Sequence, residues 1–150
     1  MLKRLLASLT RDTTPEPAEP SADVLLVDDD PSLLALLKGS LEGQDYRVTT
    51  AANGREGVET AWRERPDLIV LDGNMPEMDG FEALKRLRRD RRTARTPVIM
   101  LTMRVREGDV LAGFKAGAQE YLTKPVLVGE LIDSVSEQLR RSRRTTLAYA

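Results

Sequence analysis

The chain has 150 residues, which predicts one domain with short extensions. Its 23 Lys and Arg and 24 Asp and Glu give a formal net charge of −1, which argues against a dedicated nucleic-acid-binding protein but leaves a local basic patch open. It contains no cysteine and no histidine, which excludes disulfides, zinc–thiolate sites, cysteine nucleophiles, histidine-ligated metals and the usual histidine general base. Any metal is therefore held by oxygen ligands, which favours Mg²⁺, Ca²⁺ or Mn²⁺.

Residues 1–22 predict a flexible N-terminal extension. Three of the eight prolines fall within residues 15–20, a density typical of an extended linker. Residues 2–9 place leucines at helical spacing beside basic residues, which suits either a frayed tail or a basic amphipathic anchor for a membrane surface or a partner. The apolar runs are too short for a membrane span and lack a signal-peptide pattern, so we expect a cytoplasmic protein.

From Asp23 onward, short apolar runs alternate with stretches of helical periodicity. Nearly continuous apolar runs suit strands that are buried on both faces of a parallel sheet. The expected strands are residues 24–27, 46–51, 68–71, 98–101 and 120–123. The expected helices carry apolar stripes from Leu33 to Leu41, Val58 to Trp62, Phe81 to Leu87, Val110 to Phe114 and Leu131 to Leu139. Five strand–helix pairs in strict alternation predict an α/β fold with right-handed crossovers.

Local signals mark where the first helices begin. Asp30-Pro31 predicts an N-cap followed by proline at the first helical position. Asn53-Gly54 and Asp79-Gly80 are turn signals before the second and third helices.

The reactive side chains of the sequence gather where strands are expected to end. Ligands of open parallel sheets bind at the carboxyl ends of the strands, so we expect these side chains to share one site. They are Asp28, Asp29 and Asp30 after the first strand, Asp72 at the end of the third, Thr102 at the end of the fourth and Lys124 after the fifth. Each is ordinary when taken alone: Asp30 is a natural helix cap, and Lys124-Pro125 is a common loop dipeptide.

The chemistry of this set favours phosphoryl transfer. Clustered carboxylates raise one another's pKa values, and a bound cation such as Mg²⁺ relieves the conflict. Lysine is a compact point charge suited to a phosphoryl oxygen, and a threonine hydroxyl donates to another. Transfer to a carboxylate makes an aspartyl phosphate by positioning and charge neutralisation, without a histidine base.

Four segments together resemble the signature sequences of response-regulator receiver domains, the phospho-accepting modules of two-component signalling. The segments are Val27–Pro31, Leu71–Gly80, Leu101-Thr102 and Ala116–Pro125. The resemblance covers residues 22–142. It implies a flavodoxin-like (βα)5 doubly wound parallel sheet with strand order 2-1-3-4-5, a receiver domain at 23–142 and a short tail at 143–150.

The resemblance also implies a role for each site residue. Asp72 matches the phospho-acceptor, Lys124 the lysine that contacts the phosphoryl group, Thr102 the hydroxyl residue that moves to meet it and Tyr121 the switch aromatic that turns inward. The Mg²⁺ ligands would be Asp29 directly, Asp28 through water, Asp72, and the backbone carbonyl of Asn74. The Lys124-Pro125 bond is usually cis in this family. The output would be a population shift of the face built from the fourth helix, fifth strand and fifth helix.

The resemblance implies a non-enzymatic, stand-alone module. A sensor histidine kinase or a histidine phosphotransfer protein would be the phosphodonor, because the chain has no histidine of its own, and a downstream protein would be the target. A phosphorylation-independent adaptor with a receiver fold is the alternative. A dehalogenase-like phosphatase is a third class, but such enzymes need a second acid where this chain has Asn74.

The sequence departs from the family pattern at a few positions. Met103 stands where a small residue is usual, and either narrows access to the site or lies over its rim. Gly73 and Val126 are also less usual, and the family tunes dephosphorylation at Asn74 and Arg104. Basic residues crowd 85–95 and 140–144, which predicts solvated helix ends and leaves an acidic-partner surface open.

Overall fold

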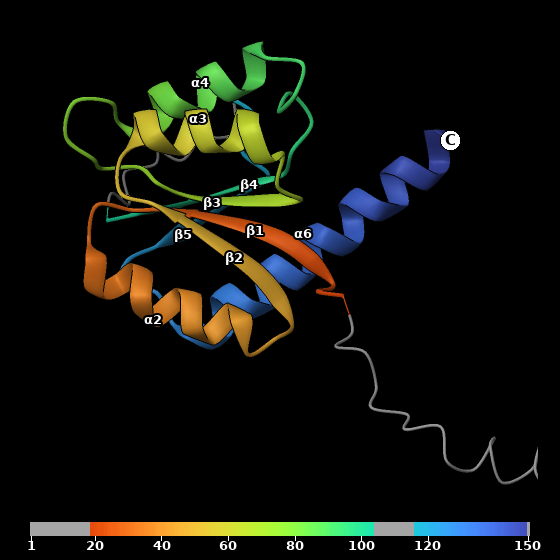
Figure 1. Ribbon diagram of the computed structural model, residues 1–150, viewed down its shortest axis with the longest axis horizontal. Coiled ribbons are helices and arrows are strands. Elements are labelled where there is room, and N and C mark those ends of the chain that lie inside the picture. The colour runs from red at the N-terminus through yellow and green to blue at the C-terminus, as the bar shows by residue number, and fades with distance from the viewer. Residues whose placement is uncertain (1–18, 104–115, 150) are drawn as a thin grey trace, which may run out of the picture.

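The computed structural model describes residues 19–103 and 116–149, with the side chains of 148 and 149 excepted. Five parallel strands form one sheet in the order β2-β1-β3-β4-β5, which confirms the predicted topology (Figure 1). The strands are β1 (Ala22–Val27), β2 (Tyr46–Ala51), β3 (Leu68–Asp72), β4 (Val98–Thr102) and β5 (Glu120–Thr123). The described helices are α2 (Pro31–Glu42), α3 (Gly54–Glu64), α4 (Gly80–Arg89) and α6 (Val128–Tyr149). The helix expected at Val110 to Phe114 lies outside the described residues.

Helices cover both faces of the sheet, with α3 and α4 on one side and α2 and α6 on the other (Figure 1). Alternate residues of each strand supply the two cores because successive side chains point to opposite faces. In β1, Leu26 packs with α2 and α6, whereas Leu25 and Val27 pack with α3 and α4. The central strands β3 and β4 are buried at every position, as their unbroken apolar runs predict.

Side-chain caps fix the starts of three helices. Asp30 accepts hydrogen bonds from the backbone N–H groups of Ser32 (2.9 Å) and Leu33 (3.2 Å), with Pro31 at the first helical position, as predicted. Asn53 caps α3 and Asp79 caps α4 in the same way, so their turn signals are helix starts. Each cap stabilises its helix by about 1 kcal/mol.

The last helix is longer than the sequence pattern predicts. Its core-facing residues end at Leu139, but α6 continues to Tyr149 and so spans 22 residues, or about 33 Å. Its C-terminal part projects beyond the body of the molecule (Figure 1). None of the helices in the described part of the chain is long and apolar enough to cross a membrane. The proposed anchor at residues 2–9 lies outside the described residues.

Candidate functional site

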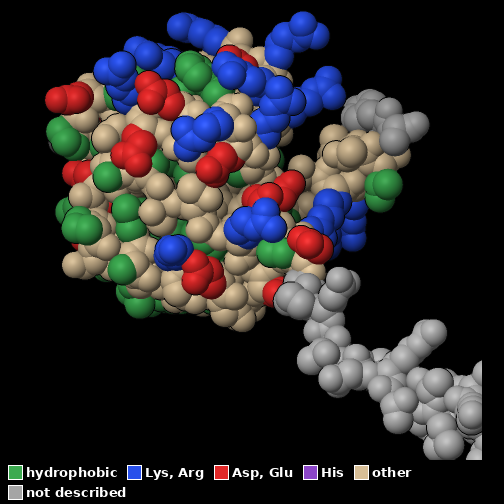
Figure 2. Space-filling model, in the orientation of Figure 1, with side chains coloured by type: hydrophobic (Ala, Val, Ile, Leu, Met, Phe, Trp, Pro, Cys, Tyr) green, Lys and Arg blue, Asp and Glu red, His purple; other side chains and the backbone are tan. Residues whose placement is uncertain are grey.

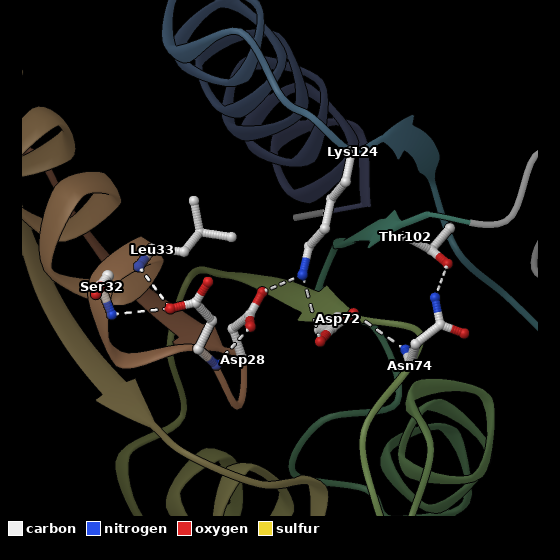
Figure 3. A network of polar contacts seen from close by, with 8 residues as sticks. Asp28, Ser32, Leu33, Asp72, Asn74, Thr102 and Lys124 are labelled. Atoms are coloured by element: carbon white, nitrogen blue, oxygen red, sulfur yellow. Dashed lines mark hydrogen bonds and ion pairs between the residues drawn. The ribbon is translucent and has the colours of Figure 1, made fainter.

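The parallel register brings four strand ends to one edge of the sheet. Asp72, the last residue of β3, pairs with Leu101 of β4, and Thr102 pairs with Thr123 at the end of β5. Asp28 follows β1, and Lys124 follows β5. The side chains converge in one place, as predicted from their position in sequence (Figure 3).

Two of the carboxylates at this edge are buried. Asp28 is 3% exposed and Asp72 is 2% exposed, whereas Asp29 is exposed to solvent. Carboxylate oxygens of these three residues lie within 4.8 Å of one another. Asp30 instead points its carboxylate into the first turn of α2, and its backbone N–H donates to Oδ1 of Asp28 at 2.9 Å. The run of three aspartates therefore divides into two site residues and one helix cap.

Lys124 bridges the two buried carboxylates. Its Nζ lies 2.7 Å from Oδ2 of Asp28 and 3.4 Å from Oδ2 of Asp72. Burial alone lowers the pKa of Lys124, but hydrogen bonds and the negative charges of Asp28 and Asp72 outweigh burial and raise it. Lys124 therefore stays protonated and offsets part of the negative charge at this edge.

Asp72 is held in an unfavourable environment for a charged group. Burial, and to a smaller extent the charge of Asp28, raises the pKa of Asp72 from 3.8 to about 6. The backbone N–H of Asn74, which donates to Oδ1 at 3.0 Å, and the charge of Lys124 oppose this shift. At neutral pH the carboxylate is ionised, and a bound cation would relieve the cost of burying its charge.

The loop between β3 and α4, residues 73–79, contacts the buried Thr102. The amide of Asn74 donates to Oγ1 of Thr102 at 2.6 Å (Figure 3). A Cβ on Gly73 would lie 3.0 Å from both Cβ and Oγ1 of Thr102, so the glycine lets the hydroxyl approach the loop. Gly80 is also required, because a Cβ there would lie 2.1 Å from the carbonyl oxygen of Asp72.

The loop contacts to Thr102 were not predicted from the sequence. The only signal for them was the Gly73-Asn74 pair that directly follows Asp72. A dipeptide in a loop does not reveal which side chain of a neighbouring strand it will contact.

The remaining predicted residues lie around this centre. Tyr121 is half-buried in β5 and packs against the core under α4. Met103 is 71% exposed, so its side chain is not packed into the acidic pocket. The Lys124-Pro125 peptide bond is cis, as the resemblance implied. Arg104 lies outside the described residues.

The donor set fits a hard divalent cation. The carboxylate oxygens of Asp28, Asp29 and Asp72 lie within 4.8 Å of one another, so every side-chain ligand in this cluster is an oxygen. Asp28 and Asp72 are buried, whereas Asp29 is exposed, so water can reach the cluster from the side of Asp29. Mg²⁺ prefers such a set, since it binds one or two carboxylates and retains several water molecules. The role of the Asn74 carbonyl as a further ligand stays a prediction.

The sequence matches the family described as response regulator receiver domain over residues 24–136. The chain belongs to this family. Receiver domains are signalling modules of two-component systems that take phosphate from histidine kinases and act on downstream targets, and they bind Mg²⁺ in an acidic pocket. In this receiver, Asp28, Asp29 and Asp72 form the acidic cluster that corresponds to such a pocket.

The relatives of this receiver include both long and short proteins. The DNA-binding dual master transcriptional regulator RpaA of Synechocystis is 45% identical over 121 residues, which are 81% of this chain and 50% of RpaA. Protein PilH of Pseudomonas aeruginosa is 38% identical over 79% of this chain and 98% of PilH. The chain thus spans about half the length of RpaA and of the other transcriptional regulators it matches, but nearly all of PilH.

Solved structures show the same fold. The chemotaxis protein CheY4 of Vibrio cholerae superimposes with a TM-score of 0.74 at 36% identity, over 77% of this chain and 97% of CheY4. A CheY-like receiver domain protein from Methanospirillum hungatei gives a TM-score of 0.78 at 30% identity, over 82% of this chain and 97% of that chain.

Proposed function

We propose that this receiver is a phosphorylation switch in which Asp72 accepts a phosphoryl group in a Mg²⁺-dependent reaction. The observation that supports this most is the environment of Asp72, a buried carboxylate with a raised pKa between Lys124 and the Asp28–Asp29 pair. A sensor histidine kinase or a histidine phosphotransfer protein is the proposed donor, and a downstream protein is the proposed target. An acyl phosphate such as acetyl phosphate serves as a small-molecule donor.

The reaction forms one bond and breaks one. A carboxylate oxygen of Asp72 attacks phosphorus, and the bond from phosphorus to the donor nitrogen or oxygen breaks, with its electron pair leaving on the donor. Lys124 holds one phosphoryl oxygen by its charge, and the N–H of Asn74 continues to orient Asp72. Asp28, Asp29, Asp72 and the Asn74 carbonyl are the proposed ligands of Mg²⁺, which neutralises the charge of the transferred group when bound.

The response proposed for the switch runs through Thr102 and Tyr121. Thr102 is fully buried, and its Oγ1 accepts a hydrogen bond from the amide of Asn74, so its own O–H group would donate to a phosphoryl oxygen on Asp72. Tyr121 lies two residue pairs from the end of β5 at which Thr102 pairs with Thr123, and it is half-buried. A shift of both would alter the face to which β5 and α6 belong, and with it the affinity for a partner.

The two alternatives have less support. An adaptor would be favoured if Met103 blocked access to Asp72, but the Met103 side chain is 71% exposed rather than packed into the pocket. The phosphatase needs an acid at position 74, whereas Asn74 is an amide that is engaged with Thr102.

The proposal is tested by intact-protein mass spectrometry after incubation with Mg²⁺ and acetyl phosphate. The wild type should gain a single phosphoryl adduct that is absent with EDTA and absent from Asp72→Ala. Asp133→Ala, which removes an exposed carboxylate of α6, is the matched control and should be labelled like the wild type. Equal labelling of Asp72→Ala and the wild type would refute the assignment of Asp72.

A further inference from the structure

The end of the sheet opposite the acidic site carries two adjoining hollows. One, of about 550 Å³, lies between the segment before β4 and the C-terminal half of α6. The other, of about 480 Å³, lies between that segment and the residues that precede β3. Both are lined by Arg95, Pro97 and Ser142, so they form one continuous groove. We call it the basic groove; its other cationic lining residues are Arg91, Arg92 and Arg141.

The charge of this end is strongly positive. Residues 85–95 contain seven Lys or Arg and one Asp, and residues 140–144 contain four Arg, although the whole chain has a net charge of −1. Figure 2 shows Lys and Arg side chains gathered over α4 and the segment that follows it, and again near the base of the projecting part of α6. Among the described residues that line the two hollows, the one acidic residue is Asp67, against four arginines, so this end is predominantly but not wholly basic.

Some of these arginines are already neutralised and others are not. Arg92 binds Asp90 at 2.8 Å and lies over the ring of Trp62 at 5.0 Å, while Arg141 binds Glu137 at 2.9 Å. Arg91 and Arg95 are exposed and form no ion pair or side-chain hydrogen bond with any described residue. Both line the hollow of about 480 Å³, and their five guanidinium donors each are available to a ligand.

We propose that the basic groove binds an extended acidic peptide segment of a partner protein. Guanidinium groups match carboxylates with two parallel hydrogen bonds, and Pro66, Ala94 and Pro97 give the groove an apolar floor for side-chain stems. Single-stranded nucleic acid is disfavoured, because none of the described residues that line the two hollows is aromatic and bases would have no stacking partner. The net charge of −1 also disfavours a long polyanion that extends beyond the groove.

The groove is separate from the phosphorylation site proposed above. Strand β4 runs from the groove end at Val98 to the site end at Thr102, which is about 13 Å. The described residues that line the two hollows include none of the residues of the phosphorylation site. The groove is tested in the unphosphorylated chain, so the outcome of that test does not depend on whether Asp72 accepts a phosphoryl group.

The test is fluorescence anisotropy with a labelled oligo-glutamate peptide and, in parallel, a labelled oligothymidylate of the same charge. The wild-type chain should bind the peptide saturably, more tightly than the oligothymidylate, and more weakly as salt increases. Arg91→Glu/Arg95→Glu should weaken peptide binding by about tenfold or more, because two attractions become repulsions. Arg91→Ala/Arg95→Ala, which introduces no repulsion, should weaken it by a smaller factor of about threefold.

Lys38→Glu/Arg55→Glu is the matched control, since it makes the same change in net charge at exposed positions on α2 and α3. This double variant should bind the peptide within about twofold of the wild type. The proposal is overturned by the absence of saturable peptide binding or by an equal loss in the control variant. Tighter binding of the oligothymidylate would overturn it in favour of a nucleic-acid surface.

Discussion

Replacing Asp72 with asparagine should stabilise the metal-free protein at neutral pH. The side chain is 2% exposed, and its pKa is raised from 3.8 to about 6. The native state therefore binds a proton at Asp72 more tightly than the unfolded state does. Each pKa unit corresponds to about 1.4 kcal/mol, so ionisation of Asp72 costs the folded state about 3 kcal/mol above pH 6.

The effect should depend on pH in a defined direction. Because the folded-state pKa is raised, the stability that this group contributes is present below about pH 4 and is lost as the pH rises through about 6. The amide side chain of the Asp72→Asn variant does not titrate, so its free energy of unfolding should match that of the wild type near pH 4. By pH 7.5 it should exceed the wild-type value by about 3 kcal/mol.

The assay is urea unfolding in the presence of EDTA, followed by far-UV circular dichroism, at a series of pH values from about 4 to 7.5. Asp90→Asn is the control with the opposite sign, because hydrogen bonds from Arg92 lower the pKa of Asp90 to about 2. That variant should be less stable than the wild type by a difference that stays nearly constant from about pH 4 to 7.5, because Asp90 is already largely ionised in both the folded and the unfolded chain over this range. A difference between Asp72→Asn and the wild type that stays constant with pH, or a less stable variant at pH 7.5, would refute the reasoning.

Three other variants test the contacts around Asp72. Lys124→Met should cost about 3 kcal/mol in urea unfolding at pH 7.5, since two buried carboxylates lose their partner; unchanged stability would contradict this. Gly73→Ala should cost about 1–2 kcal/mol through its clash with Thr102, and a neutral effect would show that the loop relaxes. Asn74→Ala should cost about 1 kcal/mol by removing the bond to Thr102; a stabilised variant would speak against that bond.

The strands and the site residues were predictable from the sequence because their signals are local. Unbroken apolar runs are typical of strands that are buried on both faces, and β3 and β4 are buried at every position. Asp28, Asp72 and Lys124 were predicted to meet because each follows a strand, and parallel strands end at a common edge. The cap at Asp30 was likewise predictable from its neighbour Pro31.

Contacts between distant side chains were not predictable in the same way. The bond from Asn74 to Thr102 and the space left by Gly73 depend on how the β3–α4 loop crosses the end of β4. The length of α6 was underestimated, because no apolar stripe continues beyond Leu139 although the arginines there are good helix formers. The basic groove required both the sheet topology and the extra turns of α6.

The central claim is that Asp72 itself carries the phosphoryl group, and borohydride trapping tests it most directly. The receiver is incubated with Mg²⁺ and acetyl phosphate and then treated with borohydride, which reduces an aspartyl phosphate to homoserine. Peptide mapping by tandem mass spectrometry then locates the homoserine. We predict homoserine at position 72 alone, and none when EDTA is present. Homoserine at position 28 or 29, or none at position 72 in a sample whose intact mass shows the adduct, would contradict the account.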